Sequence, residues 1–150
     1  MTAPFRILFL SALGVWIVAL ALGIGGIAWL VRRRGRDAAW PAIHTLAPLV
    51  DLLGTWAGVV ASAALLLGRV GYGWPWAAAL GLVALMVTAS LYDRAVLLPS
   101  LDAARKRLQA APGESDKWER DWRFLWRMAG IARAATLAMA VGALVLGWVA

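Results

Sequence analysis

Four long apolar stretches alternate with short polar segments along the chain. The stretches cover about residues 5–31, 45–67, 76–98 and 126–149. Each comes close to, or exceeds, the roughly 20 residues that an α-helix needs to cross about 30 Å of hydrocarbon. Inside such a segment only a helix satisfies all of its own backbone hydrogen bonds. The pattern therefore predicts an all-α fold, a bundle of four transmembrane helices that forms a single domain over residues 1–150.

Two of these stretches have informative ends. The first is too long for the apolar core of a signal peptide, and its basic cluster, residues 32–36, follows it rather than precedes it. We therefore expect this helix to be retained. The third is interrupted by Asp93 and Arg94, and we expect its helix to end before Pro99, because proline lacks the N–H that a helix interior uses.

Basic residues gather in the two segments that follow the first and third stretches. They are Arg32, Arg33, Arg34 and Arg36 in one segment, and Arg105, Lys106, Arg107, Lys117, Arg120 and Arg123 in the other. The opposite side has only Arg6 and Arg69. The positive-inside rule places both basic segments in the cytoplasm. We expect a multi-pass protein of the bacterial inner membrane with both termini on the periplasmic side, and the short hairpin at residues 68–75 makes the second and third helices antiparallel neighbours.

Composition supports the bilayer as the solvent. The chain is 63% hydrophobic and 15% charged, whereas soluble domains are about 45–50% apolar and about 25% charged. The net charge of +7 would suggest nucleic acid as the partner of a soluble protein. Here the basic residues flank apolar stretches, so membrane lipids are the expected partner and nucleic acid is not. The chain has no cysteine, which excludes disulfides, thiolate metal sites and a cysteine nucleophile.

A tryptophan-rich run precedes the fourth stretch. Trp118, Trp122 and Trp126 recur at four-residue steps, and Asp116 and Glu119 have the spacing of a capping box. We expect a short amphipathic helix that lies in the membrane interface before the last span. An N-terminal extension of that span, packed on the bundle, is an equally good interpretation, and a partner-docking surface is a third.

Two other tryptophans lie far from the expected interfaces. Trp16 and Trp56 both come near the middle of the membrane in this register. We expect each ring to pack against a neighbouring helix or a lipid-like ligand.

Small residues mark expected helix contacts. The second stretch carries a GxxxG motif, and the fourth repeats the four-residue step; the residues are Gly54 and Gly58, and Ala134, Ala138 and Gly142. Such faces let two backbones approach closely where lipid gives no hydrophobic drive for association. They can serve the bundle itself or another subunit, and we favour the bundle.

The second stretch also has a polar or small face along nearly its whole length, which we expect to point inward. It consists of His44, Pro48, Asp51, Thr55, Gly58 and Ser62. In the expected orientation, three helices bring two acids and two arginines to one depth: Asp51, Asp93, Arg94 and Arg133. One charge at mid-helix costs about 2.5–3.5 kcal/mol, and pairing reduces that cost. We predict a paired cluster with Tyr92 and His44 nearby. It either locks the bundle or forms the polar floor of a ligand cavity or proton path.

The residues offer little for catalysis. The only histidine, His44, excludes a bis-histidine haem within the chain, although His44 could still ligate a haem together with a methionine, or a single-ligand pigment. The four methionines show no cluster for copper, and we predict no metal site. No catalytic serine, paired-carboxylate or phosphate-loop motif stands out, so we do not expect an enzyme. The identity of any cofactor stays open, with a lipid or a pigment as the candidates.

The layout resembles a family of small, uncharacterised bacterial four-helix integral membrane proteins, which are distantly similar to the copper-resistance D domain and to the four-helix protoporphyrinogen oxidase. The similarity is carried by the arginine-rich segment after the first span, the Gly71-Tyr-Gly-Trp-Pro75 hairpin, the Leu97-Leu98-Pro99 step and the run from Trp118 to Arg127. The related proteins have a Leu-His pair early in the first span, where this chain has Leu10-Ser11. The resemblance implies a fold and a location, and no activity.

Two functions remain after these exclusions. The first is a non-enzymatic accessory or structural subunit of a larger respiratory, photosynthetic or transport complex, with other membrane subunits as partners, because the chain has almost no soluble mass with which to act alone. The second is a small membrane protein that binds haem, pigment, quinone or lipid against the polar face of the second span.

Overall fold

The computed structural model describes residues 3–68, 73–110 and 115–149, and every element in this part of the chain is helical. The elements are α1 (Ala3–Arg34), α2 (Arg36–Leu67), α3 (Trp74–Tyr92), the π-helical segment η1 (Asp93–Leu97), α4 (Leu98–Ala110) and α5 (Ser115–Val149). The prediction of an all-α fold is confirmed.

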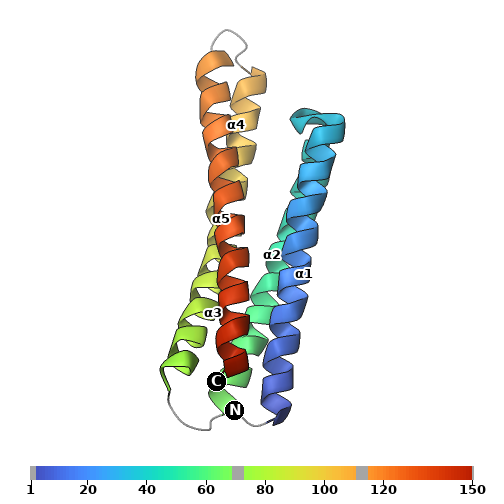
Figure 1. Ribbon diagram of the computed structural model, residues 1–150. Coiled ribbons are helices and arrows are strands. Elements are labelled where there is room, and N and C mark those ends of the chain that lie inside the picture. The colour runs from blue at the N-terminus through green and yellow to red at the C-terminus, as the bar shows by residue number, and fades with distance from the viewer. Residues whose placement is uncertain (1–2, 69–72, 111–114, 150) are drawn as a thin grey trace.

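Four continuous helical rods make up the molecule, because α3, η1 and α4 follow one another without a break (Figure 1). The rods are α1, α2, the run Trp74–Ala110, and α5, and each is long and apolar enough to cross a membrane. The prediction of four long apolar helices is therefore confirmed. The rods extend well beyond the predicted stretches, mainly at the end where the basic residues gather, which we call the basic end.

The rods form a ring in which each packs closely against two neighbours. α1 packs against α2 and α5, and α3 packs against the same two helices. Consecutive rods are antiparallel, so both described ends of the chain lie together at the end opposite the basic one (Figure 1). The predicted hairpin at residues 68–75 falls partly outside the described residues, as does Arg69.

A single residue joins α1 to α2 at the basic end. Gly35 has a φ of 77° and a ψ of 164°, a backbone conformation that side-chain-bearing residues rarely adopt. The residues after it are helical at once, so α2 begins well before the predicted stretch 45–67. Pro41 lies inside this part of α2 and removes the amide that would bond the Asp37 carbonyl. Arg105 Nη2 donates to that carbonyl instead, at 3.4 Å.

The third rod passes through Pro99, which corrects the expectation that the helix ends before it. Proline has no N–H and its ring crowds the carbonyl four residues earlier. The preceding turn is widened into the π-helical segment η1, in which the Leu98 N–H bonds the Asp93 carbonyl five residues back. π-Helical segments are rare and occur mostly as single turns inside longer α-helices, as here.

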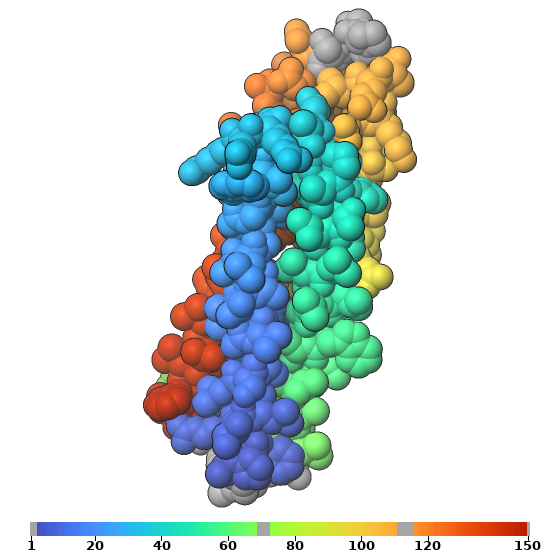
Figure 2. Space-filling view, turned by 90° about the vertical axis from the view of Figure 1, so that its right-hand side faces the viewer, coloured from blue at the N-terminus to red at the C-terminus, as the bar shows by residue number. Residues whose placement is uncertain are grey.

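The predicted interfacial helix is not a separate element. Residues 115–149 form one helix, so the tryptophan run is the first part of α5 and follows the rival interpretation of an extension of the last span. This extension pairs with α4. Figure 2 shows the two helices projecting beyond the turn between α1 and α2.

Two apolar cores hold the rods together. The larger lies toward the chain termini, where the largest fully buried side chains are Trp16, Phe9, Leu13, Leu65, Met86 and Val83. The smaller lies at the basic end and consists of Trp40, Leu97, Leu101, Ala104, Trp122 and Ala129. Polar residues lie between the two cores, and they are the starting point for a functional site.

Candidate functional site

A buried ion pair joins the third rod to α5. Arg133 on α5 donates from Nε to Asp93 Oδ2 at 2.9 Å, and its Nη2 lies 2.9 Å from the same oxygen. Asp93 is 3% exposed and the side chain of Arg133 is 15% exposed. Each charge alone would be costly in this apolar setting, and the pair offsets much of that cost. Asp93 Oδ1 is buried without a hydrogen-bond partner among the described residues.

Asp51 on α2 lies beside this pair. It is 4% exposed, and its Oδ2 has no hydrogen-bond partner in the described part of the chain. Asp51, Ser90, Asp93, Arg133 and Thr136 line a cavity of about 10 Å³, which is the size that holds one water molecule. We call these five residues the polar chamber. Ser90 and Thr136 were missed from the sequence, although each lies three residues from a charged member and so shares its helix face.

The predicted cluster thus contains three of its four members. Arg94 is exposed, because it follows Asp93 directly on a helix and so points to a different side. Tyr92 is 53% exposed, and His44 is exposed although the polar face of α2 that carries it was expected to point inward. The His44 ring lies 6.1 Å from that of Trp40, between ring centroids. The predicted cofactor ligand is therefore a surface residue of α2.

The inward face of α2 is filled by the indole of Trp16 at Gly54 and Gly58, together with Val87 of α3 at Gly58. A Cβ atom built on Gly54 would lie 2.8 Å from Trp16 Cε2, and one on Gly58 would lie 2.9 Å from Trp16 Cζ3. The GxxxG motif therefore receives the ring of Trp16 from α1. Thr55 turns its hydroxyl back to the Asp51 carbonyl at 2.8 Å. This packing leaves no room for a ligand against this part of the face.

The small residues that recur at four-residue steps on α5 do not pack into the bundle as the GxxxG motif of α2 does. Ala134 and Ala138 are exposed on the outer side of the helix, whereas we favoured an internal contact. Gly142 is half-buried, and a Cβ there would be 3.4 Å from Leu82 Cδ1. The face of α5 that enters the bundle carries Ala129, Thr136, Ala140, Ala143 and Gly147. The four-residue step of alanines was insufficient to tell which side of α5 faces inward.

The tryptophan run packs inward rather than outward. Trp122 is 4% exposed, and its ring lies 6.5 Å from that of Trp40 on α2 and 5.8 Å from that of Trp126, between centroids. Trp118 is half-buried between Arg107 and Lys117, whose charged groups lie 5.3 Å and 5.1 Å from its ring centroid. The interpretation of these three residues as a partner surface is corrected for Trp122, which is buried within the chain.

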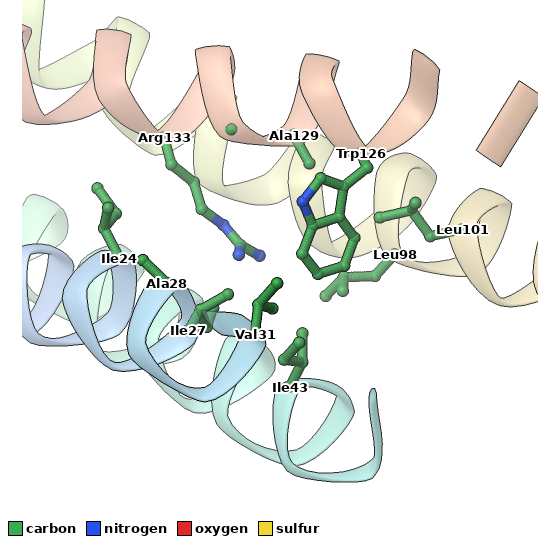
Figure 3. Close-up of a pocket in the computed structure, with 11 residues that line it drawn as sticks. Ile24, Ile27, Ala28, Val31, Ile43, Leu98, Leu101, Trp126, Ala129 and Arg133 are labelled. Carbon is green, nitrogen blue, oxygen red and sulfur yellow. The ribbon is translucent and has the colours of Figure 1, made fainter. Parts of the chain in front are cut away.

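A groove of about 200 Å³ opens between α1 and α5, next to the polar chamber. Its lining residues are Ile24, Ile27, Ala28, Val31, Ile43, Leu98, Leu101, Trp126, Ala129, Gly130 and Arg133. Figure 3 shows Trp126 and Arg133 projecting from α5 into this space, toward α1 and α2. Arg133 also lines the polar chamber, so it joins the groove to the buried acids. No sequence pattern indicated this groove, because its walls come from four elements.

Comparison with known proteins finds no relative that would assign a function. No protein-family model matches the chain, and no curated protein or solved structure matches it. The resemblance to small bacterial four-helix membrane proteins is therefore an expectation from the sequence alone, and the geometry of the molecule carries the functional argument.

Proposed function

We propose that this chain is a multi-pass integral membrane protein that serves, without catalysis of its own, as an accessory subunit of a larger membrane assembly. The membrane location is supported by the outward faces of the four rods, which expose large apolar side chains on every rod. Examples on the four rods in order are Leu22, Trp56, Leu85 and Ile131. Water-soluble monomers rarely expose contiguous apolar patches larger than a few hundred Å².

The proposed orientation follows from charge. Arg32, Arg33, Arg34 and Arg36 lie at one end of the molecule, together with the basic residues of α4 and the start of α5. Both chain ends lie at the other (Figure 1). The positive-inside rule supports the basic end in the cytoplasm of a bacterial inner membrane and both termini in the periplasm.

One observation carries the proposal of a partner subunit. Gly130, Ala134 and Ala138 follow one another at four-residue steps on the exposed side of α5, and the bundle does not use them for its own packing. Nothing in the chain comes within 4 Å of a Cβ built on Gly130. Such a face lets a second helix approach closely. A transmembrane helix of another protein is the partner that this face would suit.

The test is purification in a mild detergent followed by mass spectrometry of the proteins that come with the chain. The double variant Ala134→Leu, Ala138→Leu should release the partner, because the larger side chains keep a second helix away. The double variant Ala77→Leu, Ala84→Leu changes two exposed alanines of α3 and should retain it. A wild-type chain that runs alone as a monomer would refute the proposal.

A second function is favoured by a specific feature, the groove beside Arg133. A ligand-binding protein was the alternative from sequence, with the ligand against the polar face of α2. Trp16 covers that face at Gly54 and Gly58. A ligand would instead occupy the groove between α1 and α5, where the lining is apolar apart from the guanidinium of Arg133 and the indole nitrogen of Trp126.

A further inference from the structure

The groove beside Arg133 has the form of a site reached from the lipid. Among its lining residues only Ala28 on α1 and Gly130 on α5 are exposed, so the mouth lies between these two helices. Ile43 and Leu98 are buried and belong to the inner wall. An apolar cavity with a few polar groups at fixed positions is the usual form of a small-molecule site. In the proposed membrane location, its mouth opens at the side of the bundle, in the cytoplasmic half.

Arg133 supplies the polar end of the groove. Its Nε and Nη2 both serve Asp93, and a guanidinium carries five N–H groups in all. The Nη1 group has no hydrogen-bond partner among the described residues. Figure 3 shows the guanidinium reaching into the groove beside the Trp126 ring. It can therefore donate to an acceptor on a ligand without releasing Asp93.

The charges around Arg133 favour a neutral hydrogen-bond acceptor on the ligand over an anionic one. Asp93 already balances the guanidinium, and Asp51 lies in the same polar chamber. An anionic headgroup would bring a further negative charge toward two carboxyl groups, and like charges in an apolar setting repel strongly. A neutral acceptor, such as a carbonyl oxygen, avoids this repulsion and still accepts a hydrogen bond from Arg133.

Trp126 and the volume of the groove limit the shape of the ligand. The indole offers a flat wall, and aromatic groups prefer offset or edge contacts with other rings. The volume of about 200 Å³ is below the roughly 300–1,000 Å³ of sites that enclose a drug-sized ligand. The groove thus suits a single small ring system whose apolar tail remains outside, and a porphyrin is too large for it.

We propose that this groove binds the ring of a lipid-soluble quinone, with a ring carbonyl on Arg133, the ring against Trp126 and the tail leaving between Ala28 and Gly130. The inference deepens the second function above and requires the membrane location, but it does not require a partner subunit. No electron transfer is part of it.

The test uses the full chain in nanodiscs of a single zwitterionic phospholipid, with a decyl-substituted benzoquinone as the probe. Quinones quench tryptophan fluorescence, so binding in the groove should add a saturable component to the linear quenching caused by probe dissolved in the lipid. Trp126→Phe should reduce that component, because it removes the indole that would contact the quinone ring, while Trp122 and Trp40 remain nearby. Trp56→Phe, which removes an exposed indole on the outer side of α2, should leave it.

Two further pairs of variants test the groove with the Trp126 indole left in place. Gly130→Leu should weaken probe binding about tenfold or more by filling the mouth. Gly81→Leu is its control, because Gly81 is also exposed and has equally open surroundings on α3. Arg133→Lys keeps a cation for Asp93 but loses the planar set of donors, so it should weaken binding while the protein still folds. Arg127→Lys, at an exposed position on α5, should not.

Each outcome decides the proposal. Saturable quenching that Gly130→Leu abolishes and Trp126→Phe reduces, and that their controls preserve, supports it. Quenching that is linear in probe for the wild-type chain overturns it, as does saturable quenching that all variants share. Extraction of the protein with organic solvent adds a last check. A retained phospholipid that Gly130→Leu releases, with no quinone bound, would assign the groove to an acyl chain and overturn the proposal. The nanodiscs contain the chain without other subunits, so these results do not depend on a partner helix, which would cover the groove mouth if it packed on Gly130.

Discussion

Trp16 on α1 occupies the space that any side chain at residue 54 of α2 would need. The Trp16 ring is fully buried, and its Cε2 atom would lie 2.8 Å from a Cβ placed on Gly54. The indole nitrogen is buried without a hydrogen-bond partner among the described residues. The close approach of α1 and α2 at this level therefore depends on a glycine, and the contact is made by a ring against a backbone.

Gly54→Ala should destabilise the protein because the fully buried ring has no room to move. Overpacking a filled core costs about 1–3 kcal/mol, which exceeds the gain of about 1 kcal/mol from replacing a helical glycine by alanine. The measurement is the free energy of unfolding in mixed micelles. Gly81→Ala is the control, since nothing lies within 4 Å of its Cβ, and it should be neutral or stabilising. Adding Trp16→Phe to Gly54→Ala should recover part of the loss, and no recovery would contradict this contact.

Asp93 and Arg133 should be energetically coupled. Removing one partner of a buried pair costs about 3–5 kcal/mol, because the other charge is left unpaired. We expect Asp93→Asn and Arg133→Gln each to lower the free energy of unfolding strongly, and the double variant to lose much less than the sum. Arg127→Gln changes an exposed arginine of α5 and should stay within about 0.5 kcal/mol of the wild type. Single losses that simply add would mean that the pair is not coupled.

The rods and the depth of the buried charges follow from the sequence because both depend on composition along one axis. The length of an apolar stretch predicts a helical rod. The position of Asp51 or Arg133 within its stretch predicts the depth of that charge along the bundle axis. The rotation of each helix about its axis is a different quantity. It is set by packing against all neighbours at once, so Arg94 was expected inside and is exposed, while Ala134 and Ala138 were expected inside and face outward.

The other differences between the predicted and the observed structure have local causes. Pro99 was read as a helix end, but a π-helical turn absorbs its missing amide and the rod continues to Ala110. For the tryptophan run the sequence left open a separate interfacial helix or an extension of the last span, and the run belongs to α5. Once α4 extends the third rod, its apolar face gives Trp122 a surface to pack against. The groove beside Arg133 was not predicted, since a cavity depends on the spacing between helices.

The absence of cysteine makes the proposed orientation testable by single-cysteine labelling. Ala3→Cys lies at the exposed start of α1 and Gln109→Cys lies near the exposed end of α4. A membrane-impermeant maleimide should label Ala3→Cys in intact spheroplasts and should label Gln109→Cys only after permeabilisation. The opposite pattern would reverse the orientation. Labelling of both in intact spheroplasts would contradict a membrane barrier between the two ends, and this result would be separate from any result on quinone binding.

Trp122 should be among the strongest anchors of the basic end. It is buried against Trp40 on α2 and Trp126 on α5, and the Arg36 guanidinium lies 6.0 Å from its ring centroid. Trp122→Ala leaves a large cavity and should lower the free energy of unfolding by about 3–5 kcal/mol. Trp56→Ala, on the outer side of α2, is the matched control and should cost far less.

Trp122→Phe separates packing from hydrogen bonding at this position. The indole N–H is buried without a hydrogen-bond partner in the described part of the chain, and phenylalanine removes it while keeping an aromatic ring in place. A buried, unpaired donor costs about 1–3 kcal/mol, which offsets much of the lost ring volume. We therefore expect Trp122→Phe to stay within about 1.5 kcal/mol of the wild type. A small cost for Trp122→Ala as well would mean that the ring rests on lipid rather than on Trp40, and it would restore the interfacial-helix interpretation.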